Sequence, residues 1–297
     1  MDADWLFPTA ESISQRLKAG KLHHALIFLG KQGAGKSILA NLVARRILCR
    51  QSVSAEPCGV CQSCNLNHAG SHPDLLVLKT ETTYGVDLIR EAIEQLNKKS
   101  QMGDAKVLLI PDAQLMTVSA ANALLKTLEE PTANTYIILT QQTGLKALLP
   151  TINSRCEKHT ISVVNKQQVQ SWLVQQQAEV TRTLFDMYWQ SPFLLKQLSE
   201  EDNADILEFV ESVESNPAVL SHLPNGLLEK STILLDWMLH TLNARMKQVD
   251  GRSLSFDLCF EVQKTVMQAR QQLAQQGTNK SLQFSKCLRE FQRFLTT

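Results

Sequence analysis

The chain has 297 residues, of which 43% are hydrophobic and 20% are charged, a composition typical of globular proteins. This length exceeds one ordinary compact domain and is enough for two or three, each with its own core. The 30 basic and 29 acidic side chains leave a formal net charge of +1, so no whole-molecule field would draw the chain onto nucleic acid. No apolar run approaches the length needed to span a bilayer, and the N-terminus MDADWLF is acidic where a secretory signal is basic. We therefore expect a cytoplasmic protein without membrane contact.

The segment GKQGAGKS lies directly after an apolar run and directly before a helical pattern, which predicts a strand, a phosphate-binding loop and a helix. Gly30, Gly33 and Gly35 let the backbone turn sharply, so that successive N–H groups can converge on phosphate oxygens. Lys36 can reach the terminal phosphates, and the Ser37 hydroxyl can ligate magnesium. A glycine-rich turn that matches by chance is the alternative, but the strand and helix are the context that the motif requires. We expect these five residues to bind ATP or ADP with Mg²⁺.

Four of the seven cysteines fall close together, at Cys49, Cys58, Cys61 and Cys64. In a reducing compartment such clustering indicates a metal rather than disulfides. Four thiolates at these spacings can surround one tetrahedral Zn²⁺ and leave no ligand position open, so the predicted zinc site is structural. Free thiols in a flexible insertion and iron–sulfur ligation are the alternatives.

Strands and helices are predicted to alternate as far as about residue 162, which indicates a parallel three-layer domain. The phosphate-loop strand at 25–29 is followed by a helix at 38–48. Three further strands are predicted at 74–78, 106–110 and 136–140, and two further helices at 85–99 and 119–130.

The predicted strand at 106–110 ends in the segment PDAQ. A phosphate-loop protein that hydrolyses ATP usually carries acidic residues here, one to help hold magnesium and another to position or activate water. Asp112 can serve the first role, although it can also simply cap the next helix. Ala113 and Gln114 stand where the second carboxylate is expected, and neither can accept a proton from water. Weak or absent hydrolysis is therefore predicted.

Arg155 lies in the segment TINSRC, between Ser154 and Cys156. It can be an ordinary surface charge, or in an assembly it can reach a nucleotide bound to a neighbouring subunit. Beyond this segment every predicted element is helical. We expect a phosphate-loop domain over 1–163 with the cysteine module at 49–64, a small helical lid at 164–201 and a helical bundle at 202–297.

The residues resemble, in order, the bacterial clamp-loader members of the AAA+ superfamily. The resemblance rests on the phosphate loop, the four-cysteine insertion, HPDLLVLK, GVDLIREAIEQLN, ANALLKTLEEP and SRC. It is strong over about the first 200 residues and covers the remainder only in helical character. The PDAQ segment favours the non-hydrolysing stator subunit of the DNA polymerase III clamp loader, because the hydrolysing gamma and tau subunits carry an acidic pair there. An active gamma-type or tau-type ATPase is the alternative function.

The resemblance implies a heteropentamer with gamma or tau and delta subunits, which opens a sliding clamp and loads it onto primed DNA. Arg155 would be an arginine finger that acts in trans on a neighbour's ATP, the four cysteines would ligate zinc, and the C-terminal bundle would be a collar. Phe193 stands at about the place of the lid arginine of hydrolysing relatives, whereas Lys36 and Ser37 are intact. Nucleotide binding without turnover is therefore expected.

Overall fold

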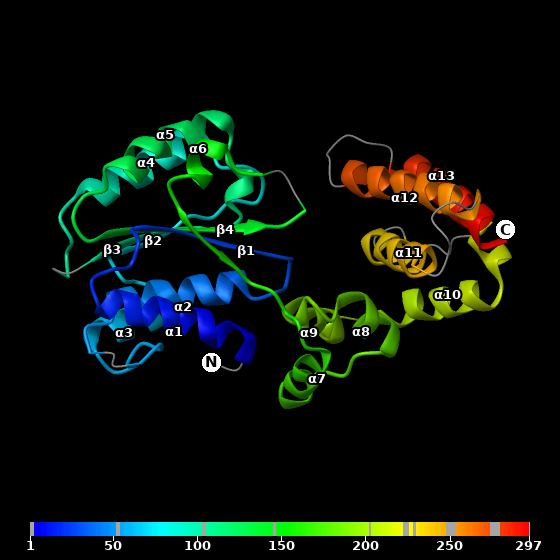
Figure 1. Ribbon diagram of the computed structural model, residues 1–297, viewed down its shortest axis with the longest axis horizontal. Coiled ribbons are helices and arrows are strands. Elements are labelled where there is room, and N and C mark those ends of the chain that lie inside the picture. The colour runs from blue at the N-terminus through cyan, green and yellow to red at the C-terminus, as the bar shows by residue number, and fades with distance from the viewer. Residues whose placement is uncertain are drawn as a thin grey trace. The chain divides into compact units, whose positions relative to one another are not determined.

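The computed structural model describes the whole chain except residues 1–2, 52–53, 103–104, 145–146, 202, 222–225, 228–229, 248–253, 274–279 and 297. Its organising element is a five-stranded parallel sheet with the order β2-β3-β4-β1-β5 (Figure 1). The strands are β1 (Ala25–Gly30), β2 (Leu75–Val77), β3 (Lys106–Ile110), β4 (Thr135–Gln142) and β5 (Glu157–Thr160). The described strands therefore form the parallel sheet that the alternating pattern predicts.

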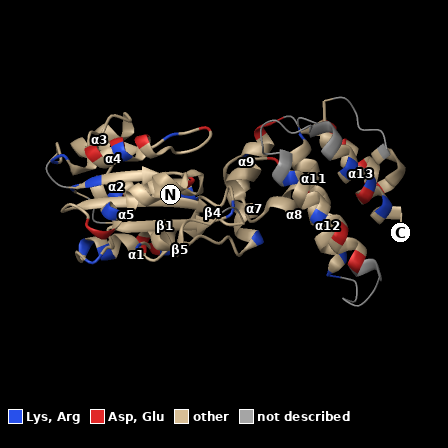
Figure 2. Ribbon diagram, turned by 90° about the horizontal axis from the view of Figure 1, so that it is seen from above, with Lys and Arg blue, Asp and Glu red and all other residues tan. Residues whose placement is uncertain are grey.

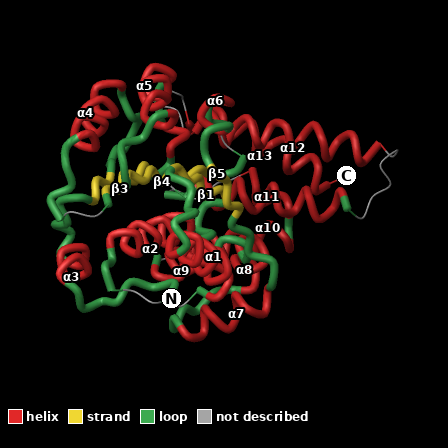
Figure 3. Tube along the Cα trace, turned by 60° about the vertical axis from the view of Figure 1, so that its left-hand side comes forward, coloured by secondary structure: helices red, strands yellow, loops and turns green. Residues whose placement is uncertain are grey.

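Helices cover both faces of this sheet (Figures 1 and 3). One face carries α4 (Val86–Asn97), α5 (Val118–Glu129) and α6 (Pro150–Asn153), and the other carries α1 (Phe7–Lys18), α2 (Lys36–Leu48) and α3 (Gln62–His68). Short 3₁₀ helices at Asp4–Leu6 (η1) and Ala113–Leu115 (η2) complete this part of the chain. The three-layer arrangement explains why β3 reads KVLLI and is buried at every position, since a central strand of such a sheet meets helices on both faces.

The edge strand β5 is absent from the sequence-based prediction. Its sequence, EKHT, is polar and alternates between half-buried and exposed positions. It becomes a strand by pairing with β1, for example Leu26 with Glu157 and Phe28 with His159. A four-residue polar edge strand carries too little local pattern to be recognised without its partner.

Two compact units divide the chain, and each has its own core. The first comprises residues 1–179 and 188–196 and includes α7 (Lys166–Gln175). The second comprises residues 180–187 and 197–297, and all of its described secondary-structure elements are helices. Its elements are α8 (Arg182–Tyr188), α10 (Ala204–Ser215), η3 (Pro217–Ser221), α11 (Ser231–Met246), α12 (Leu254–Leu273) and α13 (Lys280–Thr296), while α9 (Pro192–Glu200) runs from the first unit into the second. The finer three-domain division stays a prediction.

The second unit buries aromatic and aliphatic side chains between its helices, among them Trp237, Phe284 and Phe291. The Trp237 and Phe291 rings meet edge to face, with centroids 5.3 Å apart. This packing gives the unit a core of its own, as expected for a helical bundle. None of the helices in the described part of the chain is long and apolar enough to cross a membrane.

Candidate functional site

The phosphate loop joins β1 to α2, as the sequence predicts. Gly33 and Gly35 have φ values of +69° and +104°, a conformation that residues with a side chain rarely adopt. The helix begins at Lys36, so its positive N-terminal end faces the loop. Ser37 is exposed on the first turn. The structure thus brings the predicted loop residues together with the geometry of an anion-binding turn.

Lys36 is turned into the loop and is only 7% exposed. Its Nζ donates a hydrogen bond to the carbonyl of Lys31 at 2.8 Å. Burial lowers the pKa of this ammonium group, and the nearby charge of Asp112 opposes the shift. The lysine is therefore held against the loop, with a loop carbonyl as its acceptor.

Asp112 follows β3 and has left-handed backbone geometry, with φ 45° and ψ 52°. Its carboxylate makes no capping hydrogen bond to η2. Instead Gln114 Nε2 donates to Asp112 Oδ1 at 3.1 Å, and Gln114 Oε1 accepts from the Gln142 backbone N–H at 3.3 Å. Ala113 is fully buried. The amide of Gln114 thus ties Asp112 to the end of β4, a role that the sequence pattern alone does not reveal.

The start of α9 packs directly onto the phosphate loop. The backbone N–H of Phe193 donates to the carbonyl of Gly33 at 3.0 Å. A Cβ placed on Gly33 would lie 2.6 Å from Leu194 Cβ, and one placed on Gly35 would lie 2.9 Å from the Phe193 ring. No side chain fits at either glycine while this contact is in place.

Trp5 closes the same loop from the N-terminal side. Its indole Nε1 donates to the carbonyl of Ala34 at 3.0 Å, and its ring lies 5.9 Å from Phe193 and 5.5 Å from Trp172, measured between centroids. The Phe193 and Trp172 rings are themselves 4.9 Å apart in an edge-to-face arrangement. We call Trp5, Trp172 and Phe193 the aromatic latch. The sequence pattern indicated only that Phe193 stands where hydrolysing relatives have an arginine. It did not reveal these ring contacts, because they join distant parts of the chain.

Arg155 lies between α6 and β5, and its side chain is 34% exposed. Nη1 donates to the Thr151 carbonyl at 2.9 Å and lies 3.4 Å from Ser154 Oγ. The guanidinium also forms an ion pair with Glu129, the last residue of α5. The next residue, Cys156, is buried in the core of the sheet domain. The structure therefore holds Arg155 at the surface on a firmly anchored backbone.

The four predicted zinc ligands converge on one point. Their sulfur atoms all lie within 4.8 Å of one another, with 3.8 Å between Cys58 and Cys64 and 4.0 Å between Cys49 and Cys61. Zn–S bonds of about 2.3 Å in a tetrahedron require S–S separations of about 3.8 Å. A disulfide would bring two sulfurs to about 2.05 Å, and the four thiols are free. The donor set and its spacing fit a structural Zn²⁺.

Backbone N–H groups point at the same sulfurs. Cys58 N donates to Cys49 Sγ at 3.2 Å, and Cys61 N donates to Cys58 Sγ at 3.4 Å. Donors of this kind, from Val60 and Cys61, lower the pKa of the Cys58 thiol, whereas burial raises that of Cys64. Such N–H···S bonds stabilise thiolates, which are the form that ligates metal. The neighbouring Ser63 hydroxyl donates to the Leu48 carbonyl at 2.7 Å and lies 2.8 Å from His72 Nε2, so α3 is braced against the end of α2.

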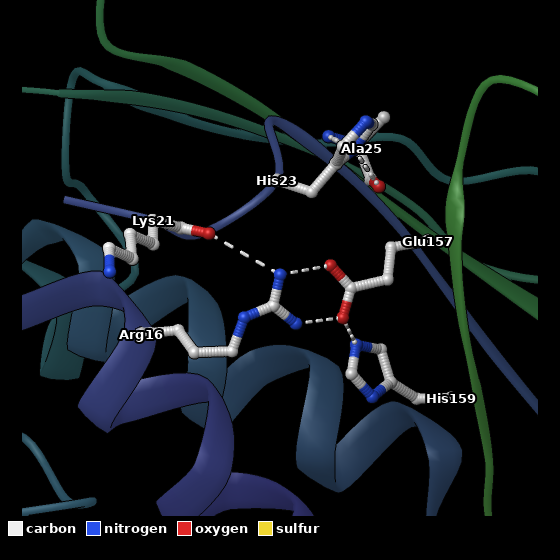
Figure 4. A network of polar contacts seen from close by, with 6 residues as sticks. All are labelled: Arg16, Lys21, His23, Ala25, Glu157 and His159. Atoms are coloured by element: carbon white, nitrogen blue, oxygen red, sulfur yellow. Dashed lines mark hydrogen bonds and ion pairs between the residues drawn. The ribbon is translucent and has the colours of Figure 1, made fainter. Parts of the chain in front are cut away.

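A polar network that the sequence pattern did not reveal joins α1 to β5 (Figure 4). Arg16 binds the Glu157 carboxylate through both terminal nitrogens, one at 2.7 Å, and also donates to the Lys21 carbonyl at 3.3 Å. His159 Nε2 lies 2.8 Å from Glu157 Oε1. Burial lowers the pKa of His159, so its neutral form is favoured. This network fixes the edge strand that directly follows Arg155 and Cys156.

The two adjacent histidines before β1 have structural roles. His23 Nδ1 lies 2.8 Å from the Ala25 carbonyl, and His24 Nε2 lies 2.8 Å from the Leu128 carbonyl at the end of α5. Their rings stack with centroids 4.4 Å apart. They lie outside the phosphate loop and the cysteine cluster, so they are assigned no chemistry.

These features define a class: a parallel-sheet domain with a glycine-rich strand–loop–helix turn and a cysteine insertion, followed by a helical unit. A solved structure supports the fold alone, a gamma subunit-related DNA polymerase III protein from Thermotoga maritima. It has a TM-score of 0.55 and 16% identity, and the match covers 96% of this chain and 98% of that one. The expected fold class is confirmed.

Comparison with protein families is more specific. A family model described as "DNA polymerase III, delta subunit" matches residues 8–165. The delta' subunit of DNA polymerase III from Escherichia coli (strain K12) is 41% identical over 172 residues, which are 57% of this chain and 51% of that protein. The delta' subunit from Pseudomonas aeruginosa is 31% identical over 245 residues, which are 78% of this chain and 74% of that protein. The chain belongs to the family of DNA polymerase III delta-prime subunits.

The match to the Escherichia coli relative spans about half of that protein's length, and the match to the Haemophilus influenzae delta' subunit covers 52% of its length. The resemblance inferred from the motifs is therefore confirmed at the level of the family.

Proposed function

We propose that this chain is the non-hydrolysing stator subunit of the clamp loader of DNA polymerase III. It helps load the sliding clamp onto primed DNA and supplies Arg155 to a nucleotide bound by a neighbouring ATPase subunit. The observation that carries the proposal is an asymmetry in the site. Arg155 is anchored and partly exposed, whereas Asp112 is followed by Ala113 and Gln114 instead of a second carboxylate, and Phe193 lies against the loop at about the place of a lid arginine.

The proposed partners are the gamma or tau and delta subunits in a heteropentamer, and through the complex the sliding clamp and primed DNA. Figure 2 shows basic and acidic residues interspersed over both units, in line with the formal net charge of +1. Such a chain is expected to contact DNA within an assembly rather than by a strong field of its own. We place the complex in the cytoplasm, with no membrane role.

We further propose that the phosphate loop binds ATP or ADP with Mg²⁺ but does not turn it over. Gly30, Gly33 and Gly35 would supply the backbone turn, Lys36 and Ser37 the phosphate and magnesium contacts, and Asp112 a second magnesium contact. Phe193 and Leu194 lie against this loop, so binding requires the start of α9 to move away. The four cysteines would hold a structural Zn²⁺, which orders the 49–64 insertion without taking part in nucleotide chemistry.

An active gamma-type or tau-type ATPase is the second candidate function. The complete phosphate loop and the buried Lys36 favour it. The PDAQ segment opposes it, because Gln114 is hydrogen-bonded to Asp112 where a catalytic carboxylate is expected.

The test of the finger is Arg155→Ala in the reconstituted complex. Arginine fingers stabilise charge in the transition state, so hydrolysis at the adjacent site should fall by about a thousandfold. The DNA-stimulated ATPase rate of the whole complex should fall accordingly, while assembly and the stability of the subunit stay unchanged. Arg90→Ala, which removes an exposed arginine from α4, is the matched control. An unchanged rate in a fully assembled Arg155→Ala complex would remove Arg155 from the mechanism.

A further inference from the structure

The Arg155 guanidinium is held by three acceptors from its own chain. Glu129 pairs with Nη2, and the Thr151 carbonyl and the Ser154 hydroxyl lie within hydrogen-bond distance of Nη1. Thr151 and Ser154 are close to Arg155 in sequence, whereas Glu129 comes from the end of α5. Glu129 is thus the contact that fixes the direction of the side chain relative to the rest of the sheet domain.

The backbones that carry the two charges are rigidly placed. Leu128, next to Glu129, is 1% exposed, and its carbonyl lies 2.8 Å from His24 Nε2. Ile152 of α6 is fully buried in the same core, and Cys156 follows it there. The ion pair therefore joins two fixed points of the backbone.

The pair leaves the guanidinium able to act on a second anion. Each terminal nitrogen of an arginine carries two hydrogens, and Glu129 pairs with Nη2. The side chains of Arg155 and Glu129 are 34% and 47% exposed, so the pair faces solvent and is weak enough to share its arginine with a phosphate. The ion pair restricts the rotamers of the Arg155 side chain in advance. This lowers the entropy cost of binding, because a free arginine side chain must lose most of its rotamer freedom before it can contact a ligand.

We propose that Glu129 is the positioning residue for Arg155, holding the guanidinium in the orientation from which it reaches the neighbour's nucleotide. This inference rests on the proposed function, because it concerns the same finger. Glu129 acts through Arg155 and itself touches neither the nucleotide nor the reacting atoms.

The test compares Glu129→Ala with Glu129→Gln in the complex reconstituted with gamma or tau and delta. Alanine removes the acceptor, so kcat of the DNA-stimulated ATPase should fall by about threefold to tenfold, the factor expected for re-ordering one long side chain, while KM for ATP is unchanged. Glutamine keeps an oxygen that can accept from Nη2 and should restore most of kcat. Glu130→Ala removes the neighbouring exposed carboxylate and is the matched control.

The double variant Glu129→Ala/Arg155→Ala separates the two ideas. If Glu129 works only through Arg155, the double variant hydrolyses ATP no more slowly than Arg155→Ala alone. If Arg155→Ala lowers kcat but Glu129→Ala does not, the positioning role is wrong and the finger stands. If Arg155→Ala itself has no effect, the proposed function fails first. A loss in Glu129→Ala that glutamine does not restore, or that adds in full to the Arg155→Ala loss, would also contradict the positioning role.

Discussion

Arg16 and Glu157 are 141 residues apart in sequence, yet they form a direct polar link between α1 and the edge strand β5. Their side chains are 38% and 23% exposed, and the carboxylate is bound by both terminal nitrogens of the arginine. A bidentate, partly buried arginine–carboxylate ion pair is stronger than an ordinary surface ion pair, although solvent still screens it. The pair therefore contributes measurably to the stability of the strand that follows Arg155.

Arg16→Ala should lower the free energy of unfolding by about 1 kcal/mol at neutral pH. The Arg16 hydrogen bond holds the pKa of Glu157 below its ordinary value of 4.5, with burial opposing the shift. A lowered carboxyl pKa stabilises the fold above that ordinary value, and this stabilisation is lost as the pH falls through the lowered pKa. The difference between variant and wild type should therefore shrink below pH 4.5.

Urea unfolding of both proteins near neutral pH and again below pH 4.5 measures this difference. Arg45→Ala, at an exposed position of α2, is the control and should change little at either pH. A difference between Arg16→Ala and wild type that stays constant across this range would mean that the charge of Glu157 is not involved.

At the scale of elements, we expect the cysteine module to depend on a bound metal ion. Residues 49–64 have little hydrophobic core of their own, and four sulfurs within 4.8 Å of one another repel when ionised unless a cation lies between them. Bound Zn²⁺ in small modules contributes on the order of ten kcal/mol to ordering the chain. We expect about one zinc ion per chain, and its removal should disorder the module while the sheet remains folded.

Metal analysis of protein prepared without chelators measures this content directly. Cys61→Ser should abolish zinc retention, whereas Val60→Ala, in the same loop and 75% exposed, should keep it. Amide exchange before and after chelation should show loss of protection in α3 and its flanking turns first. Iron in place of zinc, or a metal-free protein with a protected module, would contradict the prediction.

We expect the aromatic latch to restrict access of nucleotide to the phosphate loop. Phe193 and Trp5 contribute hydrogen bonds to two loop carbonyls, those of Gly33 and Ala34, and the Phe193 ring covers Gly35. If nucleotide binds only to molecules in which the start of α9 has moved away from the loop, its apparent affinity is the intrinsic affinity multiplied by the fraction of such molecules. Phe193→Ala removes the ring and should therefore tighten binding of ADP with Mg²⁺ by about tenfold.

Tryptophan fluorescence is a direct readout of this binding, because Trp5 and Trp172 both lie against Phe193. Phe260→Ala removes an exposed ring in the helical unit and is the control. Adding Lys36→Ala to Phe193→Ala should abolish binding. Equal affinities in wild type and Phe193→Ala would show that the latch does not limit access.

The sequence predicts well those features whose pattern lies within a short stretch of the chain. The phosphate loop, the cysteine spacing and the strands β1 to β4 each carry their pattern within a few residues, so composition and period are enough. The contacts of Phe193 with Gly33, of Glu129 with Arg155 and of Arg16 with Glu157 join distant positions, and no local period encodes them. The polar strand β5 belongs with these, because its pairing with β1 decides its conformation.

At the scale of the whole molecule, the chain has some of the residues that an ATPase site needs and lacks others. The chain has a phosphate loop with a buried lysine and an anchored arginine at the surface, but Gln114 stands beside Asp112 where a second acid would activate water. In a catalytic site formed by two subunits, one subunit can supply the arginine while the other binds the nucleotide with its own phosphate loop. ATP hydrolysis is then expected to be a property of the assembly.

The isolated chain should accordingly show no ATP turnover above a trace, with or without DNA, even where it binds nucleotide. The physical reason is that binding groups hold substrate and transition state alike, whereas turnover needs a base for the attacking water and a charge that meets the transferring phosphate. A steady-state phosphate-release assay on the purified chain measures this, with Lys36→Ala as the control for contaminating ATPases. If the chain turns over about one ATP per second and Lys36→Ala abolishes this activity, the chain is a gamma-type enzyme, because a contaminating ATPase would be unaffected by that substitution.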